Sequence, residues 1–193
     1  MLTCDPAHSA LLLMDFQTDI VSRYPEISPA VDRAATLLAG ARAAKATVIF
    51  VVVGFRPGYP ELDTRNPIFG ALAQTGRLQT TQPGSDIDLR VVPASNEPVV
   101  LKHRVGPFHG TDLDQILRAR RIDTLVLAGI STSGVVLSTV RYAADLDYKL
   151  VVVADACGDG DPEVHRLLTE KVFVRQATVV HTADVPWPKK NSR

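Results

Sequence analysis

Six runs of consecutive apolar residues recur along the chain, and none of them alternates with polar positions. Strands buried on both faces of a parallel sheet have this pattern, because neither face of such a strand meets water. The runs are rich in Val, Leu and Ile and span residues 10–14, 48–53, 99–101, 125–128, 150–154 and 179–180. They predict parallel strands in the core of an α/β protein.

Helical periodicity fills several of the segments between these runs. Apolar residues there recur at spacings of three, four or seven, which places them on one face of a helix. Strands that alternate with such helices predict a doubly wound sheet with helices on both sides. The helical sets are Leu113, Ile116 and Leu117; Val136, Val140, Ala143 and Ala144; and Val164, Leu167 and Leu168.

Capping residues indicate where two helices begin. Ser28 stands before Pro29, which predicts a helix with Ser28 as its N-cap and proline at the first helical position. Asp161 stands before Pro162 and predicts the start of a helix in the same way.

Two segments, 54–68 and 79–98, do not fit the alternation and are rich in Gly, Pro and Asn. Loops of this length in a compact domain usually have a function. We expect both to pass over the strand ends, as a lid or a subunit contact. No internal repeat is visible, so residues 1–193 are expected to form one domain.

The charge composition limits the classes of binding partner expected for this chain. The 193 residues include 21 Lys plus Arg and 21 Asp plus Glu, so the formal net charge is zero. Proteins that bind nucleic acid or membranes favour a basic face, and neither partner is expected here. A neutral chain repels its copies weakly, and a homo-oligomer, a dimer or tetramer, is expected.

The N-terminus and the cysteines indicate a compartment. The N-terminal stretch MLTCDPAHS lacks the basic region of a signal peptide, and the apolar runs are far shorter than a membrane span. Cys4 and Cys157 are too few for a disulfide framework and lack metal-type spacing. A cytoplasmic protein with two reduced thiols is therefore expected.

Two charged residues follow apolar runs and are candidates for chemistry. Ligands of open α/β sheets bind at the carboxyl ends of the strands. Asp15 ends the first run, where a carboxylate half out of water is suited to acid or base work. Lys102 follows the third run and would hold an anion, stabilise developing negative charge or pair with Asp15. His103 and Arg104 come next, but alternation sends neighbours to opposite sides, so the three cannot share one pocket.

A turn of small residues links the fourth run to a helix. The strand is expected to end at Gly129 and the helix to begin near Ser133. The free N–H groups at such a helix start offer a site for an oxyanion or carboxylate. His103 and His109 have no carboxylate at ligand spacing, so no metal site is expected. His165 is expected at the surface of its helix.

Four segments together resemble the isochorismatase-like hydrolases, also called cysteine hydrolases. They occur in the family's order over nearly the whole chain, which makes the match more specific than any one piece. The segments are LLLMDFQ, VVLKHRVGPFHGTDLDQIL, LVLAGISTSGVVLSTVRYAADL and LVVVADAC. The resemblance implies a three-layer αβα sandwich, a Rossmann-like α/β fold with a parallel sheet of about six strands.

The resemblance also implies roles for particular residues. Many members use an Asp to activate a Cys, which attacks an amide carbonyl beside a Lys, and backbone N–H groups next to a cis peptide hold the oxyanion. By resemblance Asp15 and Lys102 match the first and last of these residues, and the Ile130–Ser131 peptide matches the cis bond. Val135 falls at the position of the cysteine. Valine has no nucleophilic atom, so the resemblance does not imply the usual amidase route through a thioester.

Isochorismatases within this family also lack the cysteine. They split a vinyl ether and release pyruvate, with the aspartate as acid and water adding to the resulting cation. The resemblance therefore favours a small-molecule hydrolase that uses Asp15 and Lys102 without a covalent intermediate, a cofactor or a metal. An anionic substrate held by Lys102 is expected. Two alternatives stay open: a catalytically silent member that binds a metabolite or a protein, and an amidase with an unidentified nucleophile, for which Cys157 is a poor candidate.

Overall fold

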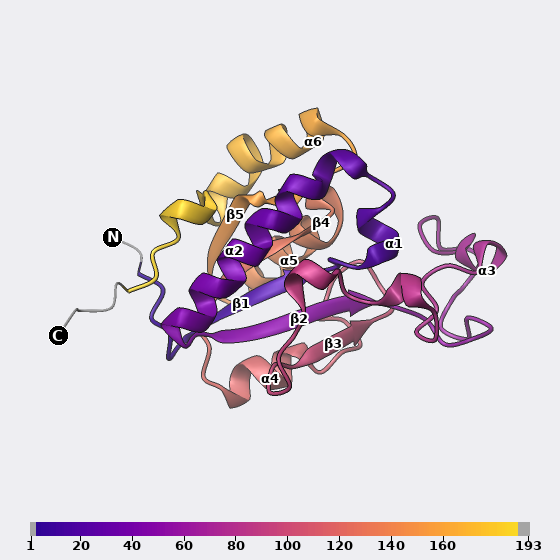
Figure 1. Ribbon diagram of the computed structural model, residues 1–193, viewed down its shortest axis with the longest axis horizontal. Coiled ribbons are helices and arrows are strands. Elements are labelled where there is room, and N and C mark those ends of the chain that lie inside the picture. The colour runs from indigo at the N-terminus through magenta and orange to yellow at the C-terminus, as the bar shows by residue number, and fades with distance from the viewer. Residues whose placement is uncertain (1–2, 189–193) are drawn as a thin grey trace.

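The computed structural model describes residues 3–188, and its centre is a parallel sheet of six strands in the order β3-β2-β1-β4-β5-β6. All five strand pairs are parallel, so every carboxyl end lies at the same edge (Figure 1). The predicted α/β fold is confirmed. The strands are β1 (Ser9–Met14), β2 (Thr47–Val53), β3 (Val99–Lys102), β4 (Thr124–Ile130), β5 (Lys149–Gly158) and β6 (Thr178–Val180).

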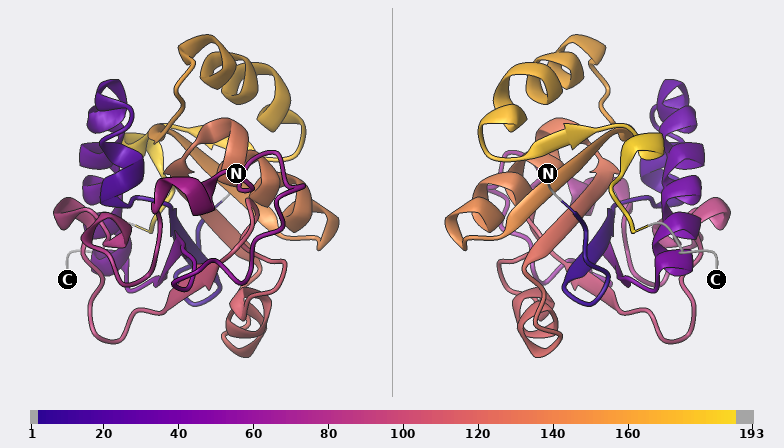
Figure 2. Two further views of the ribbon diagram at one scale, coloured as in Figure 1. Left: turned by 90° about the vertical axis from the view of Figure 1, so that its right-hand side faces the viewer. Right: turned by 90° about the vertical axis from the view of Figure 1, so that its left-hand side faces the viewer.

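Helices cover both faces of the sheet, as the alternation predicts. One face packs against α2, whose buried residues join the odd-numbered side chains of β1 in one core cluster. The other face packs against α4, α5 and the turns that follow α6 (Figure 2). None of the helices in residues 3–188 is long and apolar enough to cross a membrane. The α-helices are α1 (Thr18–Val21), α2 (Ser28–Ala44), α3 (Leu72–Thr75), α4 (Leu113–Ala119), α5 (Leu137–Asp145) and α6 (Pro162–Leu167).

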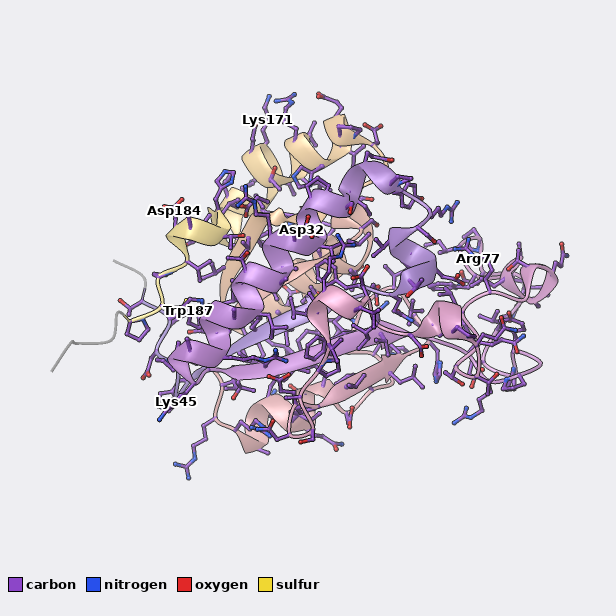
Figure 3. All side chains as sticks on the ribbon, in the orientation of Figure 1. Asp32, Lys45, Arg77, Lys171, Asp184 and Trp187 are labelled. Atoms are coloured by element: carbon purple, nitrogen blue, oxygen red, sulfur yellow. The ribbon has the colours of Figure 1, made fainter. Side chains whose placement is uncertain are left out.

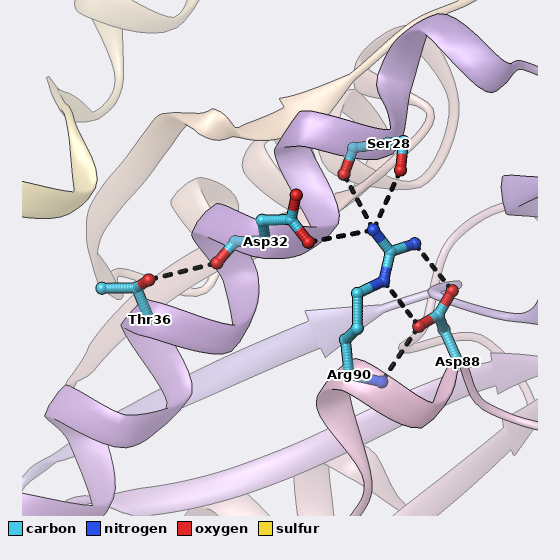
Figure 4. A network of polar contacts seen from close by, with 5 residues as sticks. All are labelled: Ser28, Asp32, Thr36, Asp88 and Arg90. Carbon is cyan, nitrogen blue, oxygen red and sulfur yellow. Dashed lines mark hydrogen bonds and ion pairs between the residues drawn. The ribbon is translucent and has the colours of Figure 1, made fainter.

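The two predicted helix starts have different outcomes. Asp161 caps α6, and its carboxylate accepts the N–H groups of Glu163 and Val164. Ser28, however, is not an N-cap, because a 3-10 turn runs directly into α2 and Ser28 already has helical torsions (φ −52°, ψ −38°). Its hydroxyl instead accepts a hydrogen bond from Arg90 at 2.9 Å (Figure 4).

The long connection between β2 and β3 behaves as two parts. Its first part carries α3 beyond the carboxyl ends of the strands, as predicted for a covering loop (Figure 1). Its second part does not stay there. It runs back along the α2 face, where Arg90 pairs with Asp88 of the connection itself and with Asp32 of α2 (Figure 4). Further along, Glu97 of the connection pairs with Arg42 near the opposite edge of the sheet.

Candidate active site

Asp15 and Lys102 lie together although β2 separates their strands in the sheet. The Asp15 Oδ2 and Lys102 Nζ atoms are 2.8 Å apart, and Nζ also donates to the carbonyl of Arg104 at 3.1 Å. Asp15 is only 5% exposed and Lys102 only 1%. The expectation that Asp15 is half out of water is therefore wrong. Among the roles expected for Lys102, the structure shows the pairing with Asp15.

Two opposing influences act on the pKa of the Asp15 carboxyl group. Burial raises the pKa of Asp15, and the neighbouring ammonium of Lys102 opposes this shift without cancelling it. The second carboxylate oxygen, Oδ1, is buried without a hydrogen-bond partner. A carboxyl group with a raised pKa and one free oxygen is suited to give a proton to a bound molecule.

The strand-to-helix turn after β4 reaches the same place. Its Ile130–Ser131 peptide is cis, as the resemblance implies. The strand ends one residue later than expected, at Ile130, and the chain enters a π-type turn over Thr132–Val136 before α5 begins. Val135 is 2% exposed, and its carbonyl accepts from the Thr139 hydroxyl at 2.6 Å.

A cavity of about 370 Å³ joins these three parts of the chain. Asp15 and Lys102 contribute its charged pair, and the turn after β4 contributes one wall. Most of the remaining lining is apolar and comes from β2, from α1 and from the long connection. The lining residues are Asp15, Ile20, Arg23, Tyr24, Val53, Ile68, Phe69, Leu78, Lys102, Val105, Ile130, Ser131, Ser133, Gly134 and Val135. His103 and Arg104 do not line it, in agreement with the alternation argument.

The side chain of Gln17 links β2 to the long connection beside the cavity, and the sequence analysis did not identify it. Its side chain is buried and both accepts from the N–H and donates to the carbonyl of Val53, at 2.8 and 2.9 Å. It also donates to the carbonyl of Ser85 in the long connection. Arg77, labelled in Figure 3, adds a second link, because its guanidinium donates a hydrogen bond to the carbonyl of Asp19. A polar residue two positions after Asp15, at the same carboxyl edge of the sheet, was the available signal.

A second group of polar residues forms hydrogen bonds to the turn after β4 from outside the cavity. The carboxylate of Asp159 accepts the N–H of Ser133 at 2.7 Å, and the ring of His165 bonds the hydroxyl of buried Thr132 at 2.8 Å. His165 is therefore half-buried rather than a surface residue as expected. Burial lowers its pKa, while Asp159 acts in the opposite direction. These residues support the turn but do not line the cavity.

Neither cysteine replaces the missing thiol. Cys157 lines a separate cavity next to α6, together with His165, and burial raises the pKa of its thiol to about 12. Cys4 is buried and belongs to the core cluster on the α2 face, and its pKa is raised to about 11. Thiols with such pKa values carry almost no thiolate near neutral pH, so they are poor nucleophiles. Within residues 3–188, no group of three or more His, Cys, Asp or Glu is arranged to hold a metal.

The fold and the sequence together define the class of protein. The sequence matches the isochorismatase domain over residues 9–184. The chain therefore belongs to the isochorismatase family of hydrolases, as the four sequence segments indicated.

Individual relatives differ in what their names say of them. The chain is 32% identical to the isochorismatase family protein YecD of Escherichia coli O157:H7, over 93% of this chain and 95% of that protein. It is 31% identical to the ureidoacrylate amidohydrolase RutB of Enterobacter sp. (strain 638), over 84% of this chain and 80% of that one. Among solved structures, a cysteine hydrolase from Pseudomonas syringae pv. phaseolicola 1448A superposes with a TM-score of 0.88 at 24% identity, covering 96% of this chain and 94% of that chain.

Proposed function

We propose that this protein hydrolyses a small anionic molecule by acid catalysis from Asp15, without a covalent intermediate. The bond split is the ether bond of a carboxyvinyl ether, and the products are pyruvate and an alcohol. The observation that carries the proposal is the carboxyl group of Asp15, which lines the cavity, has a raised pKa and leaves its Oδ1 without a hydrogen-bond partner.

The reaction needs one proton donor and one water. Asp15 gives its proton to the terminal vinyl carbon, and the positive charge that results is shared between the internal carbon and the ether oxygen. Water adds to the internal carbon and returns a proton to the Asp15 carboxylate. The hemiketal then collapses to pyruvate and the alcohol, so one water is consumed in total. Lys102 keeps the carboxylate in place through the 2.8 Å contact and stabilises it after the proton has left.

Three observations argue against an amidase route. The nucleophile position is Val135, which has no thiol. Cys157 lines another cavity. The carboxylate of Asp159 lies 2.7 Å from the N–H of Ser133, so a negative charge partly offsets the positive field of the turn that would hold an oxyanion. The first two remove the nucleophile for a thioester, and the third disfavours a tetrahedral anionic intermediate.

The pH dependence of turnover tests the role of Asp15. An acid must be protonated to act, so kcat/KM is expected to fall as pH rises through the raised pKa of Asp15. A base would give the opposite slope, with activity lost toward acid pH. The measurement is pyruvate release from carboxyvinyl ethers, coupled to lactate dehydrogenase, with the uncatalysed rate subtracted at every pH. Rates that increase with pH across this range would reject the acid role.

Alkylation tests the absence of a thiol in the chemistry. Iodoacetamide, and the double substitution Cys4→Ala/Cys157→Ala, are both expected to leave turnover unchanged, because neither thiol lines the cavity. The matched control is Val135→Cys in the cysteine-free background, where alkylation would block the cavity. Loss of wild-type turnover in step with labelling of Cys157 would instead favour an amidase with that nucleophile.

The catalytically silent alternative has its own signature. Such a protein would turn over neither the vinyl ethers nor N-carbamoyl acids and ureidoacrylate, while a ligand would still raise its melting temperature. The proposal of a homo-oligomer is independent of this choice.

A further inference from the structure

The cavity needs a group for the charge of an anionic substrate, and Lys102 is already engaged. Its ammonium contacts Asp15 at 2.8 Å and the carbonyl of Arg104 at 3.1 Å, and its side chain is 2% exposed. A substrate carboxylate would have to displace one of these two partners from an ammonium that is almost wholly buried. The earlier expectation that Lys102 holds the substrate anion is therefore weakened by this geometry.

Arg23 is the other cation that lines the cavity. It lies between α1 and the 3-10 turn before α2, is exposed, and holds its guanidinium carbon 5.4 Å from the centre of the Tyr24 ring. Stacking on the ring limits the motion of a long side chain and leaves the N–H groups free to donate. No carboxylate lies within 4.0 Å of it in residues 3–188, whereas Arg77 on the same side of the sheet is paired with Asp19.

Apolar side chains make up most of the remaining surface of the cavity. Ile20, Phe69 and Val105 line it, and Ile68 is 64% exposed at the covering segment. An apolar lining with one unpaired guanidinium fits a molecule with an apolar body and one carboxylate away from the reacting bond. A guanidinium binds a carboxylate through two parallel hydrogen bonds, which sets orientation as well as affinity.

We propose that Arg23 is the specificity-determining residue of this cavity and binds a carboxylate of the substrate remote from the bond that Asp15 protonates. This rests on the proposed function only for the identity of the reacting bond. The substrate class it defines is a small carboxylate with an apolar body whose reactive group lies against the Asp15 carboxyl group.

Calorimetric titration with benzoate and with its neutral isostere benzamide tests this without any turnover. Wild type is expected to bind benzoate about tenfold or more tightly than benzamide, and Arg23→Met is expected to abolish that preference. Arg23→Lys should retain only part of it, because an ammonium lacks the fork of a guanidinium. Arg175→Met, which removes an exposed arginine outside the cavity, is the matched control and should bind as wild type does.

Two results would overturn the proposal: equal binding of benzoate and benzamide by wild type, or an unchanged preference in Arg23→Met. Once a substrate is known, Arg23→Met should raise KM about tenfold or more with little change in kcat, since the contact is the same in the ground and transition states. A protein that binds benzoate through Arg23 but turns nothing over would reject the hydrolase and keep the carboxylate site.

Discussion

Asp15→Asn is expected to lower kcat/KM by about 10² to 10⁴-fold, which is the usual contribution of a positioned acid. The amide has nearly the shape of the carboxyl group, and its oxygen still accepts a hydrogen bond from Lys102. It has no proton of suitable acidity to give to carbon, so chemistry is lost while the cavity keeps its form. The measurement is steady-state pyruvate release, with benzoate titration to show that the cavity still binds.

The matched control for this variant is Asp32→Asn. Asp32 is an aspartate on α2 whose side chain is 67% exposed and paired with Arg90 outside the cavity. Its substitution should leave turnover unchanged. Full activity in Asp15→Asn would end the acid proposal, and the pH profile of the wild type tests the same role without any substitution.

Lys102→Met is expected to destabilise the fold strongly. Breaking a buried ion pair by removing one partner costs about 3–5 kcal/mol, because the other charge stays buried and unpaired. For a chain of this length 1 kcal/mol shifts Tm by about 2–4 °C, so a decrease of roughly 6–20 °C follows at neutral pH. Calorimetry or circular dichroism would measure it.

The deficit of Lys102→Met should depend on pH in a defined direction. Without the ammonium, only burial acts on Asp15, so its folded pKa rises further above the unfolded value. Such a group stabilises the fold fully below its unfolded pKa and loses that contribution as pH rises through the folded pKa. The Tm difference from wild type should therefore be small at acid pH and grow toward neutral pH.

Two further variants separate charge from packing in this result. Lys149→Met removes the cation of an exposed pair with Asp123, at 61% and 54% side-chain exposure, and should change Tm little. The double substitution Asp15→Leu/Lys102→Met removes both buried charges and should recover most of the lost stability. A Lys102→Met protein as stable as wild type at every pH would show that the pair is not structurally important.

Much of the fold followed from the apolar runs. Continuous apolar runs are a strong local signature of strands in a parallel sheet, so all six were located within a few residues. The expectation that each is buried on both faces is wrong for β3, an edge strand that exposes Val99 and Leu101. The error at Ser28 has a local cause. A serine before proline is a good capping signal, but the chain arrives through a 3-10 turn, which spacing along the sequence does not reveal.

The site was predictable in part for the same reason. Asp15 and Lys102 stand directly after apolar runs, so parallel strands bring them to one edge. The near-complete burial of Asp15 was not predicted, because it depends on how the connection between β2 and β3 folds over the strand ends. Long-range hydrogen bonds, such as those that Gln17 makes to Val53 and Ser85, hold that connection in place, and they cannot be read from local sequence. Likewise, the contact between His165 and Thr132 joins elements 33 positions apart, and helical periodicity does not report it.

The pairing of Lys102 with Asp15 also selects one alignment for the outermost strand. β3 alternates between exposed and buried side chains, with Leu101 partly exposed and Lys102 inside, and Val53 of β2 stands opposite Lys102. A slip of β3 by one residue would reverse this alternation, leaving the aspartate without its counterion and placing the ammonium in water. Edge strands are prone to such slips because only one neighbour holds them. The ion pair thus penalises a misaligned sheet, and under the proposed mechanism a chain folded out of register would also lack its acid.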